Sequence, residues 1–261
     1  MILPSKRTIL RMGYRTEVGR VREHNEDNLS WFDPVDNAKA LGELGWLFIV
    51  ADGMGGHAAG EVASKIAVDT IVEKYREEHA SIASALNDAI QAANEEICQR
   101  NRSGAQSGMG TTIICGVIRG DELFIAHVGD SRAYLLRKRV LTLLTKDHTL
   151  VNELLSGNVI TPEEVENHPQ RHVLSRALGK KVGVDPDIQE PLRIYNKDVL
   201  LLCSDGISGY LNDDQISFDL EANLSDPQTA ATALTQHADG VGGEDNATAI
   251  VIFVDKAVPI R

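Results

Sequence analysis

A series of apolar runs separated by very short turns is the feature that most constrains the fold of this chain. Three runs at 111–118, 121–128 and 131–137 follow one another, with turns at Arg119-Gly120-Asp121 and Gly129-Asp130-Ser131. Parallel strands need a crossover of a dozen or more residues, so neighbours joined this closely are antiparallel. Further runs with the character of strands lie at 13–19, 27–32, 46–51, 198–203 and 247–254. The pattern predicts an extensive antiparallel sheet structure.

Three longer segments have the periodicity of helices. Apolar residues recur at three- and four-residue spacing from about Gly60 to His79 and from about Ser81 to Arg102. A third helix is expected from about Pro227 to Ala238. Because these helices are segregated from the runs of strands, the order favours an α+β layered fold over an alternating βαβ winding. We expect one domain over residues 1–261.

The segment 145–190 differs from the rest of the chain because it is polar and lacks a strong apolar face. Thr161-Pro162-Glu163-Glu164 within it is a capping box with proline at the first helical position, which predicts the start of a short helix. We interpret the segment as a flap inserted into the domain, outside its core.

Four aspartates border the apolar runs. Asp52, Asp130 and Asp205 each follow a run, and Asp245 precedes the last one. Strands expose their ends, so carboxylates from strands of one core can meet at one rim, where they repel each other unless a cation lies between them. Their hard oxygens favour Mg²⁺ or Mn²⁺ over Zn²⁺. An aspartate at a turn is ordinary on its own, but four such aspartates beside apolar runs favour a metal site.

Composition narrows the possible partners. The net charge of −12 disfavours nucleic acid and anionic membranes as partners and suits a protein that binds several divalent cations. The three cysteines, Cys98, Cys115 and Cys203, form no CxxC pair and are read as reduced and buried. No apolar run approaches the roughly 18 residues of a spanning helix, and Met1 to Arg11 lacks the apolar centre of a secretory signal. We expect a cytoplasmic protein.

Other polar residues near these aspartates could complete a site for phosphate chemistry. Glu26 and Asp27 would lie at the same rim if the strand at 27–32 pairs with that at 46–51, and Gly53 could offer its carbonyl because glycine allows close approach of the main chain. Arg22 has a planar fork that can hold two phosphate oxygens, although an arginine is often only a solvated surface residue. His57, on the glycine-rich loop after Asp52, is either a proton donor or substrate-orienting group, or merely exposed.

Motifs of other phosphoryl-transfer and hydrolytic enzymes are missing. Gly104, Asp121 and Gly209 stand six residues after the three cysteines, which excludes the C-x5-R motif of cysteine phosphatases. The single D-x-D, Asp185-Pro186-Asp187, does not follow a strand, and neither a nucleotide P-loop nor a G-x-S-x-G elbow occurs. Attack by metal-activated water remains. A two-metal nuclease uses similar ligands, but the acidic charge disfavours it.

The order of six segments resembles the PPM, or type 2C, family of metal-dependent protein phosphatases in its bacterial single-domain form. The segments are Arg22-Glu23-His24-Asn25-Glu26-Asp27, Val50-Ala51-Asp52-Gly53-Met54-Gly55-Gly56-His57, Gly108-Met109-Gly110-Thr111-Thr112, His127-Val128-Gly129-Asp130-Ser131-Arg132, Ser204-Asp205-Gly206 and Gly243-Glu244-Asp245-Asn246-Ala247-Thr248. The resemblance covers residues 13–255. It implies a β-sandwich of two antiparallel sheets flanked by helical layers (α-β-β-α), in which 145–190 is a flap that influences substrate choice.

The resemblance also implies a site and a reaction. The reaction is hydrolysis of phosphoserine and phosphothreonine in proteins with two Mn²⁺ or Mg²⁺ ions, in which water activated by the metals attacks phosphorus. Arg22 would bind the phosphate and His57 would be the general acid, although Met54 stands where eukaryotic members place a histidine. The implied metal residues are Asp52 (bridging), the Gly53 carbonyl, Asp205, Asp245, Asp27 and Glu26 (through waters), and Asp130 with Asp205 for a third ion.

Partners follow from the same resemblance. We expect phosphorylated proteins as substrates, a serine/threonine kinase as the functional counterpart in bacterial signalling, and a monomer. A non-catalytic phosphoprotein-binding module on the same fold is the remaining rival, and the presence of all the metal aspartates disfavours it.

Overall fold

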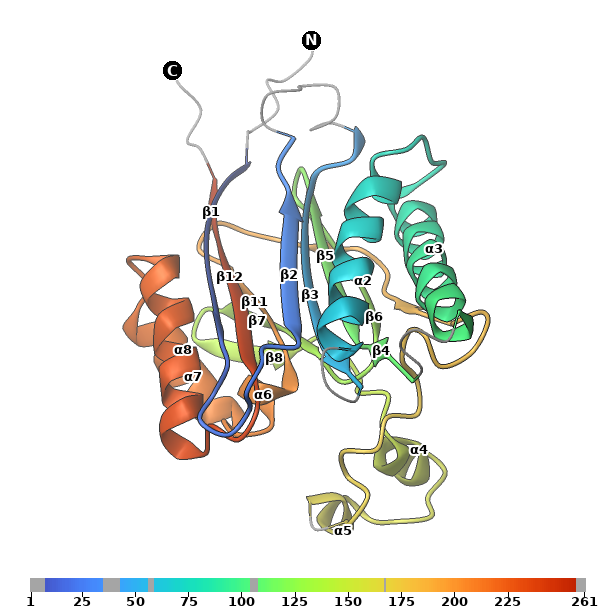
Figure 1. Ribbon diagram of the computed structural model, residues 1–261. Coiled ribbons are helices and arrows are strands. Elements are labelled where there is room, and N and C mark those ends of the chain that lie inside the picture. Colours follow the sequence, from blue (N-terminus) through green and yellow to red (C-terminus); the bar gives the residue numbers. More distant parts are fainter. Residues whose placement is uncertain (1–7, 35–42, 56–58, 104–107, 167, 257–261) are drawn as a thin grey trace.

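The computed structural model describes residues 8–34, 43–55, 59–103, 108–166 and 168–256 and shows two antiparallel sheets with helices on their outer faces (Figure 1). The five-stranded sheet has the order β1-β12-β11-β7-β8. Its strands are β1 (Thr8–Glu17), β7 (Arg132–Arg137), β8 (Val140–Leu143), β11 (Val199–Cys203) and β12 (Ala247–Lys256). Both terminal strands of the described chain, β1 and β12, pair with each other along ten residues.

The second sheet has the path β10-β6-β5-β3-β2, and β4 and β9 pair beside β3 and β6. Its strands are β2 (Asp27–Phe32), β3 (Trp46–Met54), β4 (Gly110–Thr111), β5 (Ile113–Arg119), β6 (Glu122–Val128), β9 (Asp187–Ile188) and β10 (Leu192–Arg193). β2 and β3 are paired in the register Asp27↔Asp52. This pairing places two acidic side chains side by side at one end of the sheet.

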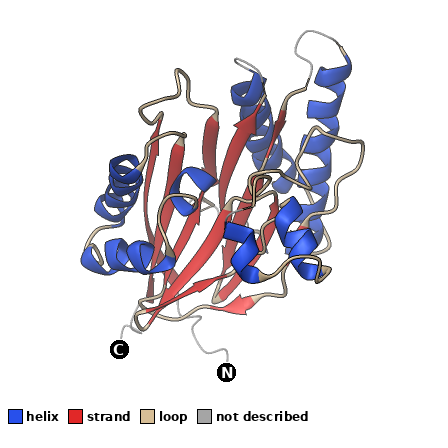
Figure 2. Cartoon of the chain, turned by 90° about the horizontal axis from the view of Figure 1, so that it is seen from below, coloured by secondary structure: helices blue, strands red, loops and turns tan. Residues whose placement is uncertain are grey.

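Three apolar layers hold the elements together. Side chains such as Val50 and Ile114 from one sheet meet Leu202 and Ile250 from the other in the layer between the sheets. The outer layers lie beneath α2 (Ala59–Tyr75) and α3 (Ile82–Arg102) on one side and α6 (Asp205–Ser208), α7 (Asp213–Ala222) and α8 (Pro227–Val241) on the other. Figure 2 shows the strands between these two groups of helices. The predicted α-β-β-α sandwich is confirmed.

The segment 145–190 leaves the sandwich after β8 and returns to it at β9. It contains α4 (Leu150–Ser156) and α5 (Pro162–Glu166), which lie beyond the end of the sheets in Figure 1. A bridge between Thr149 and Leu174 closes its base, and β9 pairs with β6. We call this segment the flap.

Some local structure differs from the sequence-based expectation. The first strand begins at Thr8 rather than near residue 13, and the described chain also contains β8, α4 and α7, which the apolar pattern did not indicate. The start of α7 has its own signal, because Asn212 and Gln215 form a reciprocal capping box. Within the described ranges, none of the helices combines the length and apolar character that crossing a lipid bilayer requires.

Candidate active site

One end of the sandwich carries a cavity of about 710 Å³ with acidic residues at its base. Loops that follow β3 and β11 and the loop before β12 all open into it. Its lining comprises Arg22, Glu26, Asp52, Gly53, Met54, Gly55, Thr112, Asp130, Arg171, His172, Leu174, Lys180, Asp205, Gly209, Tyr210, Glu244 and Asp245. The structure therefore brings together, from six separate segments, most of the residues that the sequence singles out.

Asp52 and Asp205 lie in contact at the centre of the acidic group. Burial, and then the charge of Asp205, raise the pKa of Asp52 well above its usual range. The pKa of Asp205 is also raised, first by burial, although its hydrogen bond with Asp52 lowers it. Two carboxyls can share a hydrogen bond only when one of them is protonated. The raised pKa values favour a proton shared by the pair, and a bound cation would take its place.

Asp27 and Asp130 flank this pair. Asp27 is 5% exposed, and Ser204 Oγ donates to its Oδ2 at 2.7 Å. Burial first, and then the charges of Asp205 and Asp245, raise the pKa of Asp27 to about 8, against hydrogen bonds that lower it. Burial and the charge of Asp205 likewise raise the pKa of Asp130 to about 8. Burying these carboxylates close together is therefore unfavourable in free energy, and a bound cation would remove this penalty.

Unsatisfied oxygens support the fit of a divalent cation. Asp27 Oδ1 and Asp205 Oδ1 are both buried and lack a hydrogen-bond partner within the described structure. A buried carboxylate oxygen without a partner is costly. Hard oxygen donors of this kind are the ligands that Mg²⁺ and Mn²⁺ prefer. The residues present therefore fit the divalent ions that the sequence implies.

Gly53 occupies a position that no other residue could fill. A Cβ atom there would lie 2.1 Å from Gly60 O and 2.5 Å from Glu26 O. The Gly53 N–H donates to Glu26 O at 3.1 Å, which fixes the end of β3 against the loop before β2. Glu26 itself has a pKa raised mainly by burial and lowered by Arg22. The glycine lets two acidic segments approach each other at the cavity.

Arg22 lies at the mouth of the acidic group. Its Nη2 contacts Asp245 Oδ2 at 2.8 Å, with 48% and 30% of the two side chains exposed. An exposed pair of this kind contributes at most about 1 kcal/mol. The guanidinium is thus anchored over the cavity by an interaction weak enough to yield to another anion.

Two histidines are considered for a role at this cavity. His57 lies outside the described residues, so its predicted role stays a prediction. His172, which belongs to the flap, lines the cavity, and its charge lowers the pKa of Asp205. Arg171, Lys180 and Tyr210 also line the cavity. Sequence analysis missed Arg171, Lys180 and Tyr210, because neither the polar flap nor the segment after Asp205 has a pattern that shows which side chains face the cavity.

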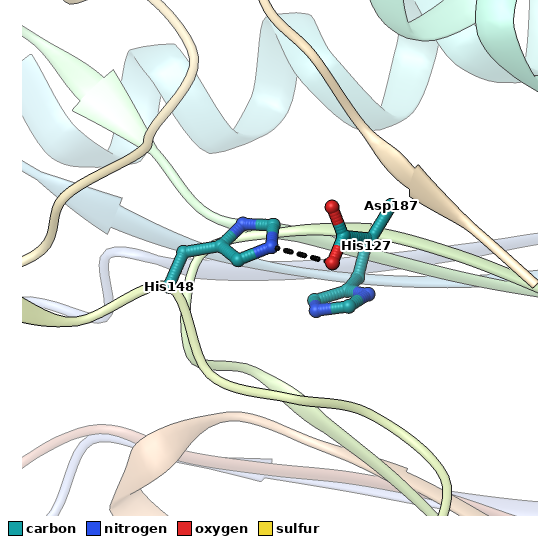
Figure 3. Close-up of side chains that lie close together, drawn as sticks. All are labelled: His127, His148 and Asp187. Carbon is teal, nitrogen blue, oxygen red and sulfur yellow. Dashed lines mark ion pairs between the residues drawn. The ribbon is translucent and has the colours of Figure 1, made fainter. Parts of the chain in front are cut away.

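A separate group of titratable side chains joins the flap to β6 (Figure 3). His148 Nε2 lies 3.1 Å from Asp187 Oδ2, and Arg176 Nη1 lies 2.7 Å from Asp187 Oδ1. His127 stacks on His148 with ring centroids 4.6 Å apart. Burial lowers the pKa of both histidines. Burial raises the pKa of Asp187, but His148 and Arg176 together lower it below its usual value.

Ligand atoms of His127, His148 and Asp187 lie within 4.8 Å of one another, close enough for a metal ion. The hydrogen bonds oppose that interpretation. His148 Nδ1 accepts the Gly129 N–H at 3.2 Å, so the neutral ring carries its proton on Nε2, which lies 3.1 Å from Asp187 Oδ2. No lone pair remains on His148 for a metal, and Arg176 already neutralises Asp187. We interpret the group as a clamp that holds both ends of the flap; we call it the flap clamp.

Comparison with known proteins identifies the family. A family model described as protein phosphatase 2C matches residues 22–240. This chain belongs to the protein phosphatase 2C family. A serine/threonine phosphatase from Listeria monocytogenes is 39% identical over 250 residues, which cover 93% of this chain and 95% of the relative. The resemblance that the six motifs indicated is confirmed.

Solved structures of the same family share the whole sandwich. A serine/threonine phosphatase of S. agalactiae superposes with a TM-score of 0.86 at 32% identity, covering 95% of this chain and all of that one. The catalytic domain of the serine/threonine phosphatase PstP, in complex with two manganese ions, has a TM-score of 0.80 at 34% identity, with 96% and 100% coverage.

Proposed function

We propose that this chain hydrolyses phosphoserine and phosphothreonine in proteins with Mn²⁺ or Mg²⁺ as cofactor. It is a protein phosphatase by family, and its named relatives act as serine/threonine phosphatases. The observation that carries the proposal is the gathering of buried carboxyls, two of them with unpartnered oxygens, at the base of a cavity with cationic side chains above it. Metal ions and cations that converge on one point suit the transfer of a phosphoryl group.

We assign the acidic residues to two metal ions and a weaker third. Divalent ions held here would lower the pKa of a water molecule and neutralise charge on the phosphoryl group. The chain's own contribution is to hold oxygens of fixed position in a partly buried cavity. The proposed metal residues are Asp52, Gly53 through its carbonyl, Asp205 and Asp245, with Glu26 and Asp27 through water and Asp130 for the third ion.

Arg22 is proposed to bind the substrate phosphate. Its exposed contact with Asp245 positions the guanidinium at the cavity without occupying all of its five N–H donors. A phosphate carries up to two negative charges and can accept two parallel hydrogen bonds from the fork. Charge that develops on the phosphoryl oxygens during the reaction would therefore strengthen the contact with Arg22.

The leaving serine or threonine oxygen needs a proton. We propose His57 as its donor, because it stands five residues after Asp52 and close in sequence to Met54 and Gly55, which line the cavity. His172 is a second candidate, since it lines the same cavity from the flap. A single general acid contributes roughly 10²–10⁴ in rate, a small part of what monoester hydrolysis requires.

The cellular setting is also a proposal. A phosphatase of phosphorylated serine and threonine needs a serine/threonine kinase as its counterpart, and we propose such a pair in a bacterial signalling system, with this chain acting as a monomer. All three cysteines are buried and unpaired, which suits a reducing compartment and supports a location in the cytoplasm. The charge of −12 supports phosphoproteins, and neither nucleic acid nor membrane, as partners.

Turnover of two substrates tests the proposal. The purified protein should hydrolyse p-nitrophenyl phosphate and a phosphothreonine peptide with Mn²⁺, lose both activities in EDTA, and regain them when Mn²⁺ is restored. A nuclease assay under the same conditions should show no cleavage. Activity that survives EDTA, or cleavage of nucleic acid without release of phosphate from the peptide, would refute the proposed function.

A further inference from the structure

The end of the five-stranded sheet opposite the acidic group carries a second cavity, of about 690 Å³. It lies between the turn that joins β7 to β8 and the turn before β11. Its lining includes Arg137, Lys138, Arg139, Tyr195, Lys197 and Leu224. We call it the basic cavity. Asp198 and Asp205 lie at opposite ends of β11, so the two cavities are separated by roughly 20 Å along the strand.

The backbone around the basic cavity is unusual. Lys138, Arg139 and Lys197 have φ angles of 52°, 65° and 70°, and Asn158 is the remaining non-glycine residue of the described chain with a positive φ. A two-residue hairpin turn with positive φ at both positions is best formed by Asn-Gly, and long side chains there are sterically disfavoured. Lys138, Arg139 and Lys197 thus have a backbone conformation that long side chains disfavour, and all three border the basic cavity. Such conflicts between sequence and local structure are expected at functional or strained sites.

The charges of the basic cavity are only partly compensated. Arg137 is held by Asp198 through contacts of 2.7 and 3.0 Å. Arg139 lies 3.4 Å from Glu221, with 82% of its own side chain exposed. Nowhere in the described chain does a carboxylate form an ion pair with Lys138 or Lys197. The protein has a net charge of −12, so this cluster is a positively charged region on an otherwise acidic protein.

Apolar surface accompanies the cations. Tyr195 is 49% exposed, Leu224 is 46% exposed and Val140, next to Arg139, is 61% exposed. The guanidinium of Arg137 lies 4.7 Å from the centre of the Tyr195 ring and holds the ring in place. Cations beside a hollow with exposed apolar side chains suit a peptide in which acidic and apolar residues alternate. A nucleic acid backbone suits the cavity less well, because binding many phosphates takes more cations than this cluster supplies.

We propose that the basic cavity docks an acidic segment of the phosphoprotein substrate, with one apolar side chain inserted between Tyr195 and Leu224. The proposal rests on the proposed function and adds a determinant of substrate choice remote from the reaction. A substrate that reaches both cavities must span about 20 Å, which takes at least about six extended residues and more along the surface. Short phosphopeptides should therefore not reach the basic cavity, and longer acidic ones should bind in it.

Binding without catalysis is the first test. The probe is a fluorescent 14-residue peptide of glutamate and aspartate with a central leucine and no phosphate, followed by fluorescence anisotropy. Lys138→Glu with Lys197→Glu should weaken binding at least tenfold. The matched control, Lys65→Glu with Arg100→Glu, makes the same change in charge on exposed positions of α2 and α3 and should change binding less than twofold. Equal losses in both double variants, or no binding by the unaltered protein, would overturn the proposal.

Kinetics with paired substrates is the second test. One substrate is a six-residue phosphothreonine peptide, and the other joins the same peptide through a 20-residue glycine-serine linker to the acidic segment. The KM of the long substrate should be at least fivefold lower than that of the short one. The Lys138→Glu, Lys197→Glu variant should remove this difference in KM, while kcat for both substrates and the KM of the short peptide stay unchanged. A KM advantage that survives in this variant would contradict the docking site. If the unaltered protein hydrolyses neither peptide, the proposed function is refuted. The docking site is then still tested by anisotropy, which does not depend on catalysis.

Further controls keep the test specific. Lys138→Ala with Lys197→Ala repeats the experiment with neutral side chains, and circular dichroism of each variant shows whether it is folded. Replacement of the central leucine by serine should weaken peptide binding several-fold. An oligothymidine that binds as tightly as the acidic peptide would overturn the proposal in favour of a general polyanion surface.

Discussion

The metal-free protein should lose stability between pH 5 and 7 because its buried acidic group must release protons. Burial raises the pKa of Asp27 from 3.8 to about 8 in the folded protein. The folded state therefore binds a proton that the unfolded chain has already released. The stabilisation from this proton is complete below pH 3.8 and is lost as the pH rises toward 8.

The magnitude follows from linkage. One proton held only by the folded state gives a slope of about 1.4 kcal/mol per pH unit in the free energy of unfolding. Between pH 5 and 7 the loss is about 2.7 kcal/mol, which corresponds to roughly 5–10 °C in Tm for a chain of this size. The raised pKa values of Asp52, Asp130 and Asp205 add to the total slope, so about 2.7 kcal/mol is the part that Asp27 alone contributes.

Urea unfolding in EDTA at pH 5, 6 and 7 measures this slope, with Asp27→Asn as the comparison. His127 and His148 have lowered pKa values and contribute a slope of the opposite sign below pH 6.5, but they do so in both proteins and cancel in the difference. The stability of Asp27→Asn relative to the unaltered protein should rise by about 2.7 kcal/mol over this range. A difference that stays constant with pH would refute the reasoning, as would an unchanged pH slope after saturation with Mn²⁺.

Three further changes test other parts of the site. Asp205→Ala should reduce Mn²⁺-dependent turnover at least a thousandfold while circular dichroism stays native, and a folded variant of near-native activity would contradict the assignment. His57→Ala should reduce phosphopeptide turnover roughly 10²–10⁴-fold and p-nitrophenyl phosphate turnover far less, because nitrophenolate leaves without a proton; equal losses would reject the general acid. His148→Ala should release the flap clamp and speed hydrogen exchange of α4 amides at least tenfold without a change in β5, and unchanged exchange in α4 would show that the clamp does not hold the flap.

The sequence reveals the acidic group well because strand ends are local features. Asp52 and Asp205 stand where apolar runs stop, and the register of β2 with β3 brings Asp27 beside Asp52 as the pairing of 27–32 with 46–51 implied. The antiparallel pairing of β5 with β6 follows from the short turn between them, but the same expectation for β6 and β7 is wrong, because the chain crosses at that turn to the other sheet, where β7 pairs with β8 and β11. Each of the confirmed features is determined by a short stretch of sequence and can be predicted from it.

Other features depend on contacts between distant segments. Arg22 meets Asp245 across 223 positions, and His148 meets Asp187 across the whole flap. The polar flap has no apolar period, so the sequence does not show that Arg171 and His172 turn toward the cavity. The positive φ angles at Lys138 and Arg139 also appear only in the structure, because this pair of residues gives no turn signal of the usual kind.

The location of bound manganese tests the central claim most directly. Crystals of the protein grown with Mn²⁺ can be measured at the manganese absorption edge, where anomalous differences show each ion. We predict two strong peaks among the carboxylates of Asp52, Asp205 and Asp245, with Asp52 in contact with both. Manganese absent from these carboxylates, or found instead between His127, His148 and Asp187, would contradict the account.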